Sequence, residues 1–189
     1  GYAIFDVVAK KPPKTLHDLA ERGLTDELVT WLKEDKRNKL DVNARDITGR
    51  TPVMVAAECG QVEILKKLVS RGGVVGLTEL HMNRSAIHFG ARNGSIPILK
   101  TLIEGVANND ERLKLVNAPD KSGFTPVFIA KTNGHQEAFE FLLMKGAQYN
   151  EASQPVPKEE GDEARGEVEV EGAESEEAAQ AVVPVPVAP

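Results

Sequence analysis

A short phrase recurs four times along this chain: a few apolar residues, a small residue, two polar residues and a glycine. The phrase ends at Gly23, Gly60, Gly94 and Gly134, so it returns at intervals of 34 to 40 residues. Self-similarity at this spacing is typical of stacked repeat proteins, in which each unit is too small to bury its own apolar face. We therefore expect a stack of units that offers a binding surface rather than a catalytic centre.

The second copy of the phrase shows the local physics of one unit. Thr51-Pro52 predicts a helix start, because threonine accepts a hydrogen bond there and proline is tolerated in the first turn. Gly60 predicts the end of that helix, since glycine adopts a left-handed conformation at little cost. A second apolar helix face follows, formed by Ile64, Leu65, Leu68 and Val69. Each unit is thus predicted to be a helix, a tight turn, a helix and a hairpin-like loop.

Three segments carry a recognisable family pattern. Residues 41–52 read Asp-Val-Asn-Ala-Arg-Asp-Ile-Thr-Gly-Arg-Thr-Pro, residues 116–126 repeat the hairpin and helix opening, and residues 142–150 match a repeat end. These units resemble ankyrin repeats. The resemblance implies an all-α repeat solenoid, in which stacked helix-turn-helix units are joined by hairpin-like loops. It covers residues 14–150 and implies four repeats.

Departures from the family pattern are confined to a few places. Asn83 stands where a hairpin glycine is expected, and asparagine tolerates the same left-handed backbone. The hairpin from 73 to 84 lacks both family motifs, so its shape is the least defined by the sequence. Two charged insertions, within residues 33–40 and 104–114, are predicted to extend a helix or a loop into solvent.

Both ends differ from the repeats. Residues 1–13 include the apolar run 2–9, which we interpret as a capping segment whose Ile4, Phe5 and Val8 cover the first unit. The alternatives are a segment that docks on a partner and the stump of a preceding domain. Residues 151–189 are rich in Glu, Ala, Gly, Val and Pro, and this composition predicts a disordered acidic tail. Because the first residue is glycine, we expect a processed form or a fragment.

The sequence offers no candidate catalytic residue, cofactor or metal ligand. Cys59 is the single cysteine, which excludes an intrachain disulfide and a site with several thiolates. The family resemblance implies structural roles for His17, His88 and His135. We therefore predict that the chain is not an enzyme, and a reducing compartment, the cytoplasm, fits best. The cytoskeleton and the nucleus are alternatives.

Charge is divided unequally along the chain. The formal net charge of −6 combines about +3 over residues 1–150 with −9 over residues 151–189. A balance this small on the repeats, beside an acidic tail, argues against nucleic acid as a partner. No apolar run approaches the roughly 18 residues of a membrane-spanning helix, so we expect no membrane partner. The tail could instead cover the arginines of the concave surface until a partner displaces it.

The function that remains is recognition of another protein. The resemblance places the binding surface at the hairpin tips and at the exposed ends of the first helix of each unit. The candidates are Ile47, Thr48, Arg50, Glu58, His81, Met82, Arg84, Arg92, Asn93, Lys121, Ser122, Phe124, Thr132 and Asn133. Ile47, Met82 and Phe124 are apolar where solvent is expected, and with the three arginines of this set they predict an anchor-and-clamp surface for an acidic or amphipathic segment.

Three roles fit such a surface. The first is a non-catalytic adaptor or scaffold module that binds a partner protein. The second is a structural subunit built into a large multiprotein assembly, for example a cytoskeletal one, with both termini lying on neighbours. The third is the repeat domain of a larger enzyme.

Overall fold

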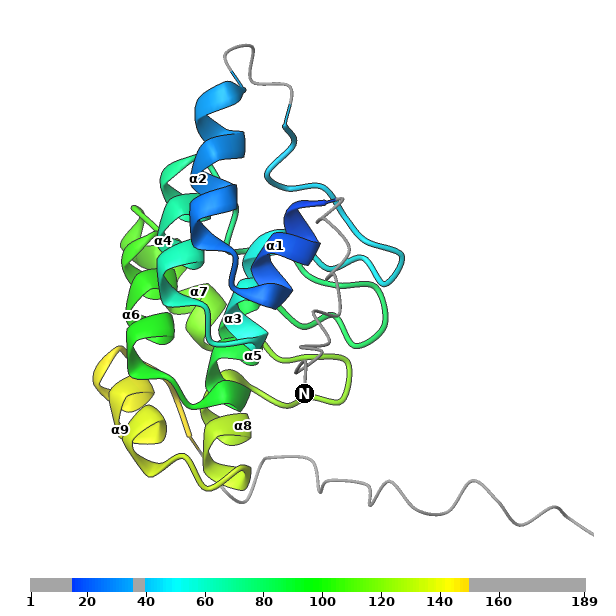
Figure 1. Ribbon diagram of the computed structural model, residues 1–189. Helices are drawn as coiled ribbons and strands as arrows, with labels where there is room; N and C mark the ends of the chain where they lie inside the picture. Colours follow the sequence, from blue (N-terminus) through cyan, green and yellow to red (C-terminus); the bar gives the residue numbers. More distant parts are fainter. Residues whose placement is uncertain (1–14, 36–39, 150–189) are drawn as a thin grey trace, which may run out of the picture. The chain divides into compact units, whose positions relative to one another are not determined.

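The computed structural model describes residues 15–35 and 40–149, and these residues form helices joined by turns and loops (Figure 1). The described helices are α1 (Leu16–Arg22), α2 (Thr25–Glu34), α3 (Pro52–Glu58), α4 (Val62–Ser70), α5 (Ala86–Asn93), α6 (Ile96–Glu104), α7 (Asn109–Val116), α8 (Pro126–Thr132) and α9 (Gln136–Met144). The predicted all-α repeat solenoid is confirmed.

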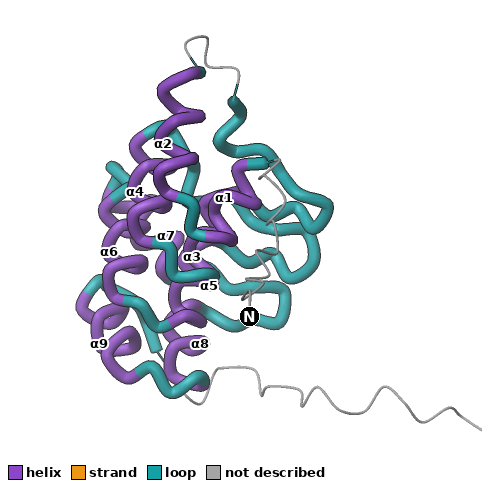
Figure 2. The backbone as a smooth tube through the Cα atoms, viewed as in Figure 1, coloured by secondary structure: helices purple, strands orange, loops and turns teal. Residues whose placement is uncertain are grey.

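The helices form two rows. The inner row consists of α1, α3, α5 and α8, in which each helix packs against the next, and the outer row consists of α2, α4, α6 and α9. Figure 2 shows the long connecting loops gathered on the side of the inner row that faces away from the outer helices. Each unit therefore contributes one inner helix, one outer helix and, between units, one hairpin.

Hydroxyl residues begin the inner helices. Thr51 Oγ1 accepts a hydrogen bond from the Met54 amide, and Pro52 follows in the first turn, where its missing amide leaves no donor unpaired. Thr125 and Pro126 occupy the same positions at the start of α8. Ser85 begins α5 without a proline, and its hydroxyl lies 2.9 Å from Nδ1 of His88. The sequence prediction of helix starts is confirmed at these positions.

Asn83 adopts the backbone conformation that was predicted from its place in the hairpin. Its φ angle is 57°, and the equivalent glycines of the neighbouring hairpins, Gly49 and Gly123, have φ angles of 81° and 84°. A left-handed conformation is unfavourable for most side chains, but asparagine accepts it because its short polar side chain bonds locally. Here Asn83 Oδ1 accepts a hydrogen bond from the Thr78 hydroxyl.

A continuous apolar core runs between the two rows of helices. Small residues on the inner helices, such as Ala56 and Ala57, are fully buried and let neighbouring helices approach closely. At Gly90 an added Cβ would lie 3.1 Å from Ile98 Cγ2 of the paired outer helix. The largest fully buried side chains come from both rows: Leu19, Leu28, Met54, Ile64, Leu65, Leu68, Ile87, Ile98, Leu99, Leu102, Ile103 and Leu142.

The second insertion forms a helix that packs on the stack. Asn108 caps α7 by accepting hydrogen bonds from the amides of Asp110 and Glu111. Val116 is fully buried, and Leu115 packs against the core. The expected helix is present, and most side chains of residues 104–114 are exposed, as predicted. Leu115 and Val116, which follow the predicted insertion, give the last turn an apolar face that joins the core.

Three predictions lie wholly or partly outside the described residues. They are the capping or docking role of residues 1–13, the disordered state of residues 151–189, and the form of the first insertion, of which residues 36–39 are not described.

Candidate functional site

One carboxylate closes each of two matching hairpins, here called the Asp46 hairpin (residues 46–50) and the Asp120 hairpin (residues 120–124). Asp46 Oδ1 accepts hydrogen bonds from the amides of Thr48 and Arg50, each at 2.9 Å. Asp120 Oδ1 accepts from the amides of Ser122 and Phe124 at 2.8 and 2.9 Å. In each hairpin the side chain thus satisfies two amides that the turn leaves without backbone partners.

The Glu79 hairpin (residues 79–84) solves the same problem with different residues. It contains one more residue than the other two, and its carboxylate belongs to a longer side chain. Glu79 Oε1 accepts from the amides of Met82 and Arg84 at 2.7 and 3.1 Å, and Oε2 accepts from the His81 amide at 2.6 Å. The extra methylene of glutamate compensates for the extra residue of the loop.

Hydrogen bonding determines the acidity of these carboxylates. Burial raises the pKa of Asp46, but hydrogen bonds from Thr48 and Arg50 outweigh it and bring the pKa to about 2. The same competition, in which the backbone amides of Arg84, His81 and Met82 oppose burial, lowers the pKa of Glu79. Both groups are therefore charged at neutral pH and hold their hairpins as anions.

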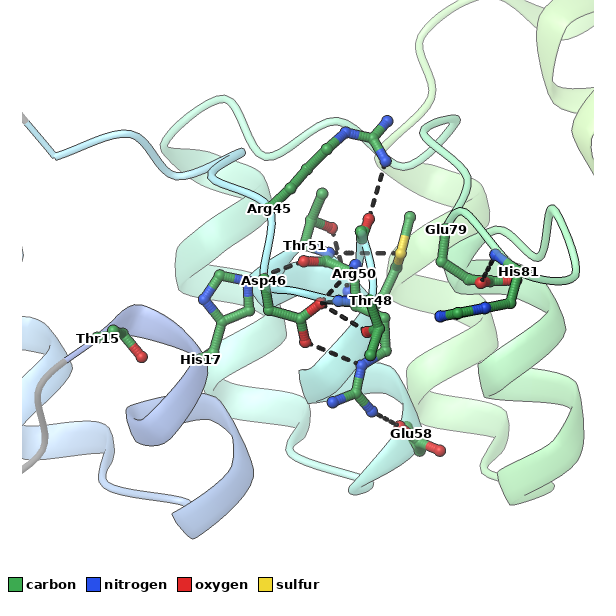
Figure 3. A network of polar contacts seen from close by, with 12 residues as sticks. Thr15, His17, Arg45, Asp46, Thr48, Arg50, Thr51, Glu58, Glu79 and His81 are labelled. Carbon is green, nitrogen blue, oxygen red and sulfur yellow. Dashed lines mark hydrogen bonds and ion pairs between the residues drawn. The ribbon is translucent and has the colours of Figure 1, made fainter.

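The two arginines that follow the tips are already paired within the chain. Arg50 Nε lies 3.1 Å from Asp46 Oδ2, and Arg50 Nη1 lies 2.9 Å from Glu58 Oε2 (Figure 3). Arg84 Nε lies 2.9 Å from Oδ2 of Asp120, whose side chain is fully buried. A partner's carboxylate would have to compete with these residues. Arg50 and Arg84 therefore connect parts of the fold, which the sequence alone did not reveal.

Neighbouring hairpins are joined through their backbones. The Leu80 amide donates to the Thr48 carbonyl at 3.2 Å, and the Lys121 amide donates to the Met82 carbonyl at 2.8 Å. Lys121 Nζ also donates to the Leu80 carbonyl at 2.8 Å. Arg45 bonds the carbonyls of Gly49 and Thr78, which adds a side-chain link. The tips thus form one connected edge.

Two apolar side chains project from this edge into solvent. Ile47 is 99% exposed, and Leu80 is 63% exposed. Ile47 was predicted as a contact residue, but Leu80 was missed. Matching the Glu79 hairpin to the ankyrin repeat pattern had placed His81 and Met82 at the tip. The signal in the sequence was the position directly after the closing carboxylate, which is Ile47 in one hairpin and Leu80 in the next.

Two hollows lie beside this edge. The smaller has a volume of about 300 Å³ and is lined by residues of the Asp46 and Glu79 hairpins together with Phe89 of α5. The larger, of about 600 Å³, lies between α1, the segment leading into the Asp46 hairpin, and Val55 of α3. Arg50 lines both. The hollows therefore form neighbouring parts of a concave surface, separated by an arginine that Asp46 and Glu58 hold in place.

The remaining tip candidates differ in exposure. His81, Lys121 and Ser122 are exposed, whereas Met82 is half-buried and lines the smaller hollow. Phe124 is also half-buried, and its ring stacks on Phe128 with 5.1 Å between the centroids. It is thus packed against the last inner helix rather than free in solvent, because it occupies the position of Arg50 without that residue's ionic partners.

Most candidates at the inner-helix ends are exposed, whereas Glu58 is half-buried, and most of them bond within the stack. Asn93 donates to the Glu58 carbonyl at 3.1 Å, and the Arg92 carbonyl lies 2.9 Å from His135 Nε2. The side chains of Thr132 and Asn133 donate to carbonyls of their own helix. The structure thus brings Thr48, Arg50, His81, Met82 and Arg84 together around the smaller hollow, whereas Ile47 lines the larger one. It places Thr132 and Asn133 on a later repeat.

The histidines on the inner helices contact the hairpins. His17 Nε2 lies 2.9 Å from the Arg50 carbonyl oxygen. His88 is buried, its Nδ1 accepts from the Ser85 amide at 3.1 Å, and its Nε2 has no hydrogen-bond partner among the described residues. Burial lowers the pKa of His88 to about 4, with a smaller opposing effect from Asp120. Burial also raises the pKa of Cys59, assisted by Glu58 and Glu21, so this thiol is not activated.

The described residues show neither a metal site nor a membrane-spanning helix. Within residues 15–35 and 40–149, no group of three or more His, Cys, Asp and Glu side chains is arranged to hold a metal ion. In the same ranges, no helix is long and apolar enough to cross a membrane.

Comparison with known proteins agrees with the geometry. A family model described as ankyrin repeats in three copies matches residues 16–112 and 75–153. The chain is 29% identical over 161 residues to a probable E3 ubiquitin-protein ligase, XBOS32, of Oryza sativa subsp. japonica, which covers 73% of this chain and 32% of the relative. It is 32% identical over 132 residues to transient receptor potential cation channel subfamily A member 1 of Homo sapiens. That match covers 70% of this chain and 11% of the channel subunit.

A third relative is alpha-latrotoxin-Lt1a of Latrodectus tredecimguttatus, 32% identical over 101 residues, which covers 52% of this chain and 7% of the toxin. The chain spans a third or less of the length of these three relatives. The family match, the two rows of helices and the hairpins agree, and the chain belongs to the ankyrin repeat family.

Proposed function

We propose that this chain binds another protein along the edge formed by the Asp46 and Glu79 hairpins, as an adaptor module without catalytic activity. Ankyrin repeats are in general non-catalytic modules for protein–protein interaction. The observation that carries the proposal is the pair of solvent-facing apolar side chains, Ile47 and Leu80, beside a hollow of about 300 Å³. Exposed apolar groups next to a concave surface are typical of interaction sites.

The contacts around this pair favour an apolar anchor over an ionic clamp. The Leu80 amide is bonded to Thr48, so both tips are held in register before any partner arrives. The side chain of Arg50 is occupied by Asp46 and Glu58. An acidic partner would gain little from that arginine, whereas a partner with an aliphatic or aromatic side chain would cover Ile47 and Leu80 and fill the hollow. Preorganisation of this kind reduces the entropic cost of binding.

The test uses two full-length double variants. Ile47→Ser/Leu80→Ser removes the proposed anchors, and Leu143→Ser/Met144→Ser removes two exposed apolar residues of α9, of which Met144 is 77% exposed. Partners captured by the unmodified chain are compared with those of each variant. Thermal unfolding first checks that both variants are folded. We then expect the Ile47→Ser/Leu80→Ser variant to lose the partners of the unmodified chain and the Leu143→Ser/Met144→Ser variant to retain them.

The α9 variant also tests membership of a large assembly. Leu143 and Met144 form a second exposed apolar surface on the outer row, which a permanent neighbour would cover. If the α9 variant, and not the tip variant, releases the chain from a large complex on size exclusion, the role is structural and the adaptor proposal is wrong.

A further inference from the structure

The larger hollow is lined by apolar side chains and by charged ones, among which four carboxylates outnumber the two arginines Arg45 and Arg50. Its walls include Leu16, Trp31 and Val55, which come from α1, α2 and α3. Acidic side chains, among them Glu21 and Asp41, also line it. Its volume of about 600 Å³ lies within the roughly 300 to 1,000 Å³ of pockets that hold ligands. An apolar segment followed by positive charge is the occupant that complements such a surface.

The chain itself contains a segment of this kind next to the hollow. Thr15, the first described residue, lines the same hollow. It is preceded by Lys10-Lys11-Pro12-Pro13-Lys14, and before these by the apolar run 2–9, Tyr-Ala-Ile-Phe-Asp-Val-Val-Ala. Residues 10–14 span at most about 18 Å when extended, so the apolar run is tethered near the hollow.

We propose that residues 2–9 bind in this hollow, with Ile4 and Phe5 against its apolar wall and Lys10 and Lys11 beside Glu21 and Asp41. The charges are complementary, because two basic residues directly follow the apolar run and carboxylates outnumber arginines in the lining of the hollow, where Asp46 already pairs with Arg50. The short tether makes the association intramolecular, which raises the effective concentration of the segment without any further contact.

This inference does not depend on the proposed function. Because Ile47 and Arg50 line the larger hollow, an occupied hollow would leave the smaller hollow and Leu80 as the free part of the concave surface. The N-terminal segment would then complete the first repeat on the side where no earlier repeat is described, and it would restrict partners to the smaller hollow and the tips.

Trp31 gives a direct readout, since it is the only tryptophan of the chain and lies in the wall of the hollow. In the full-length Ile4→Ser/Phe5→Ser variant we expect its fluorescence to shift to longer wavelength and to be quenched more strongly by acrylamide. The matched control is Val182→Ser/Val183→Ser, which removes two apolar residues near the other end of the chain. The control should leave Trp31 unchanged.

A peptide of residues 1–13, added to the Ile4→Ser/Phe5→Ser chain, should reverse the spectral change in a saturable way. The same peptide with Phe5→Ser should bind at least about tenfold more weakly, as expected from the loss of one buried aromatic side chain. Introducing Glu21→Lys into the chain should weaken binding of the unmodified peptide, whereas Glu104→Lys, at the end of α6, should not.

Either of two results would overturn the proposal. The first is a Trp31 spectrum that is the same in the unmodified chain and in the Ile4→Ser/Phe5→Ser variant. The second is a changed spectrum that the peptide does not reverse at any concentration. Neither result bears on binding at Ile47 and Leu80, which the tip variant tests separately.

Discussion

The Asp46 and Glu79 hairpins are each closed by a carboxylate that accepts from backbone amides, but they connect to the stack in different ways. The Asp46 hairpin pairs its arginine internally, with Asp46 and with Glu58 of the helix that follows. The Glu79 hairpin sends its arginine to Asp120 of the next hairpin. The first arrangement stabilises one repeat, whereas the second links two repeats through a fully buried carboxylate. Arg50 and Arg84 thus occupy the same position at the end of their hairpins, yet one stabilises its own repeat and the other links two repeats.

Replacing Asp120 should have the largest effect, because two repeats depend on it. Asp120→Ala removes the acceptor of two amides and leaves Arg84 without its partner, and breaking a buried ion pair in this way costs about 3 to 5 kcal/mol. Asp46→Ala should cost less, because that carboxylate is partly exposed. Urea unfolding of both variants measures the difference in free energy of unfolding. Equal losses would show that the cross-repeat link adds nothing.

The histidine behind the Glu79 hairpin should make stability depend on pH. The unfolded pKa of His88 is near 6.5 and its folded pKa is about 4, so only the neutral ring fits the fold. The stabilisation is complete above pH 6.5 and is lost as the pH falls towards 4, by roughly 3 kcal/mol in total.

Urea unfolding between pH 7.5 and 4.5 tests this dependence. Asp120 and Arg84 face the ring and oppose each other in their effect on the pKa of His88. His88→Gln should flatten the profile between pH 6.5 and 5. If the free energy of unfolding of the His88→Gln variant depends on pH as steeply as that of the unmodified chain, a group other than His88 causes the dependence.

Shortening the carboxylate of the Glu79 hairpin tests whether loop length and side-chain length are matched. Glu79→Asp should cost about 1 to 2 kcal/mol, since the shorter side chain cannot reach the amides of His81, Met82 and Arg84 together. Deleting Met82 in the same variant gives a five-residue hairpin like that of Asp46 and should recover part of the loss. If the deletion adds to the loss, the two lengths are not coupled.

The arginine of the Asp46 hairpin should matter least. Arg50→Ala should cost no more than about 1 kcal/mol, because both of its ion pairs are partly exposed to solvent. Arg84→Ala should cost more, since it leaves the buried Asp120 without a cation. Thermal unfolding of the two variants under the same conditions compares their stabilities. A larger loss for Arg50→Ala than for Arg84→Ala would show that the link between repeats is not the stronger of the two arrangements.

Local signals in the sequence predicted most of the fold. Glycine and asparagine at left-handed positions and hydroxyl residues at helix starts act within a few residues, so they can be found without knowing the tertiary structure. The last turn of α7 was harder, because the burial of Val116 depends on packing against distant segments.

The candidate site was predicted less completely. The exposure of Ile47 was predicted, but that of Leu80 became apparent only once the extra residue of the Glu79 hairpin was aligned by its carboxylate. The arginines were identified as charges, but their partners were not, because Arg84 and Asp120 are 36 residues apart. The sequence shows which groups are charged, whereas their availability to a partner depends on which groups the fold places beside them.

The backbone links between hairpin tips have a mechanical consequence. Directional hydrogen bonds join each tip to the next, from Leu80 to Thr48 and from Lys121 to Met82, whereas the outer helices meet mainly through apolar side chains, with one hydrogen bond from Arg71 to the Leu32 carbonyl. Apolar contacts are non-directional and tolerate small displacements better than hydrogen bonds do. When the stack bends, the outer helices should therefore separate first, and the row of hairpin tips should act as the hinge. Ile47 and Leu80 should then keep a constant spacing while the rest of the stack bends.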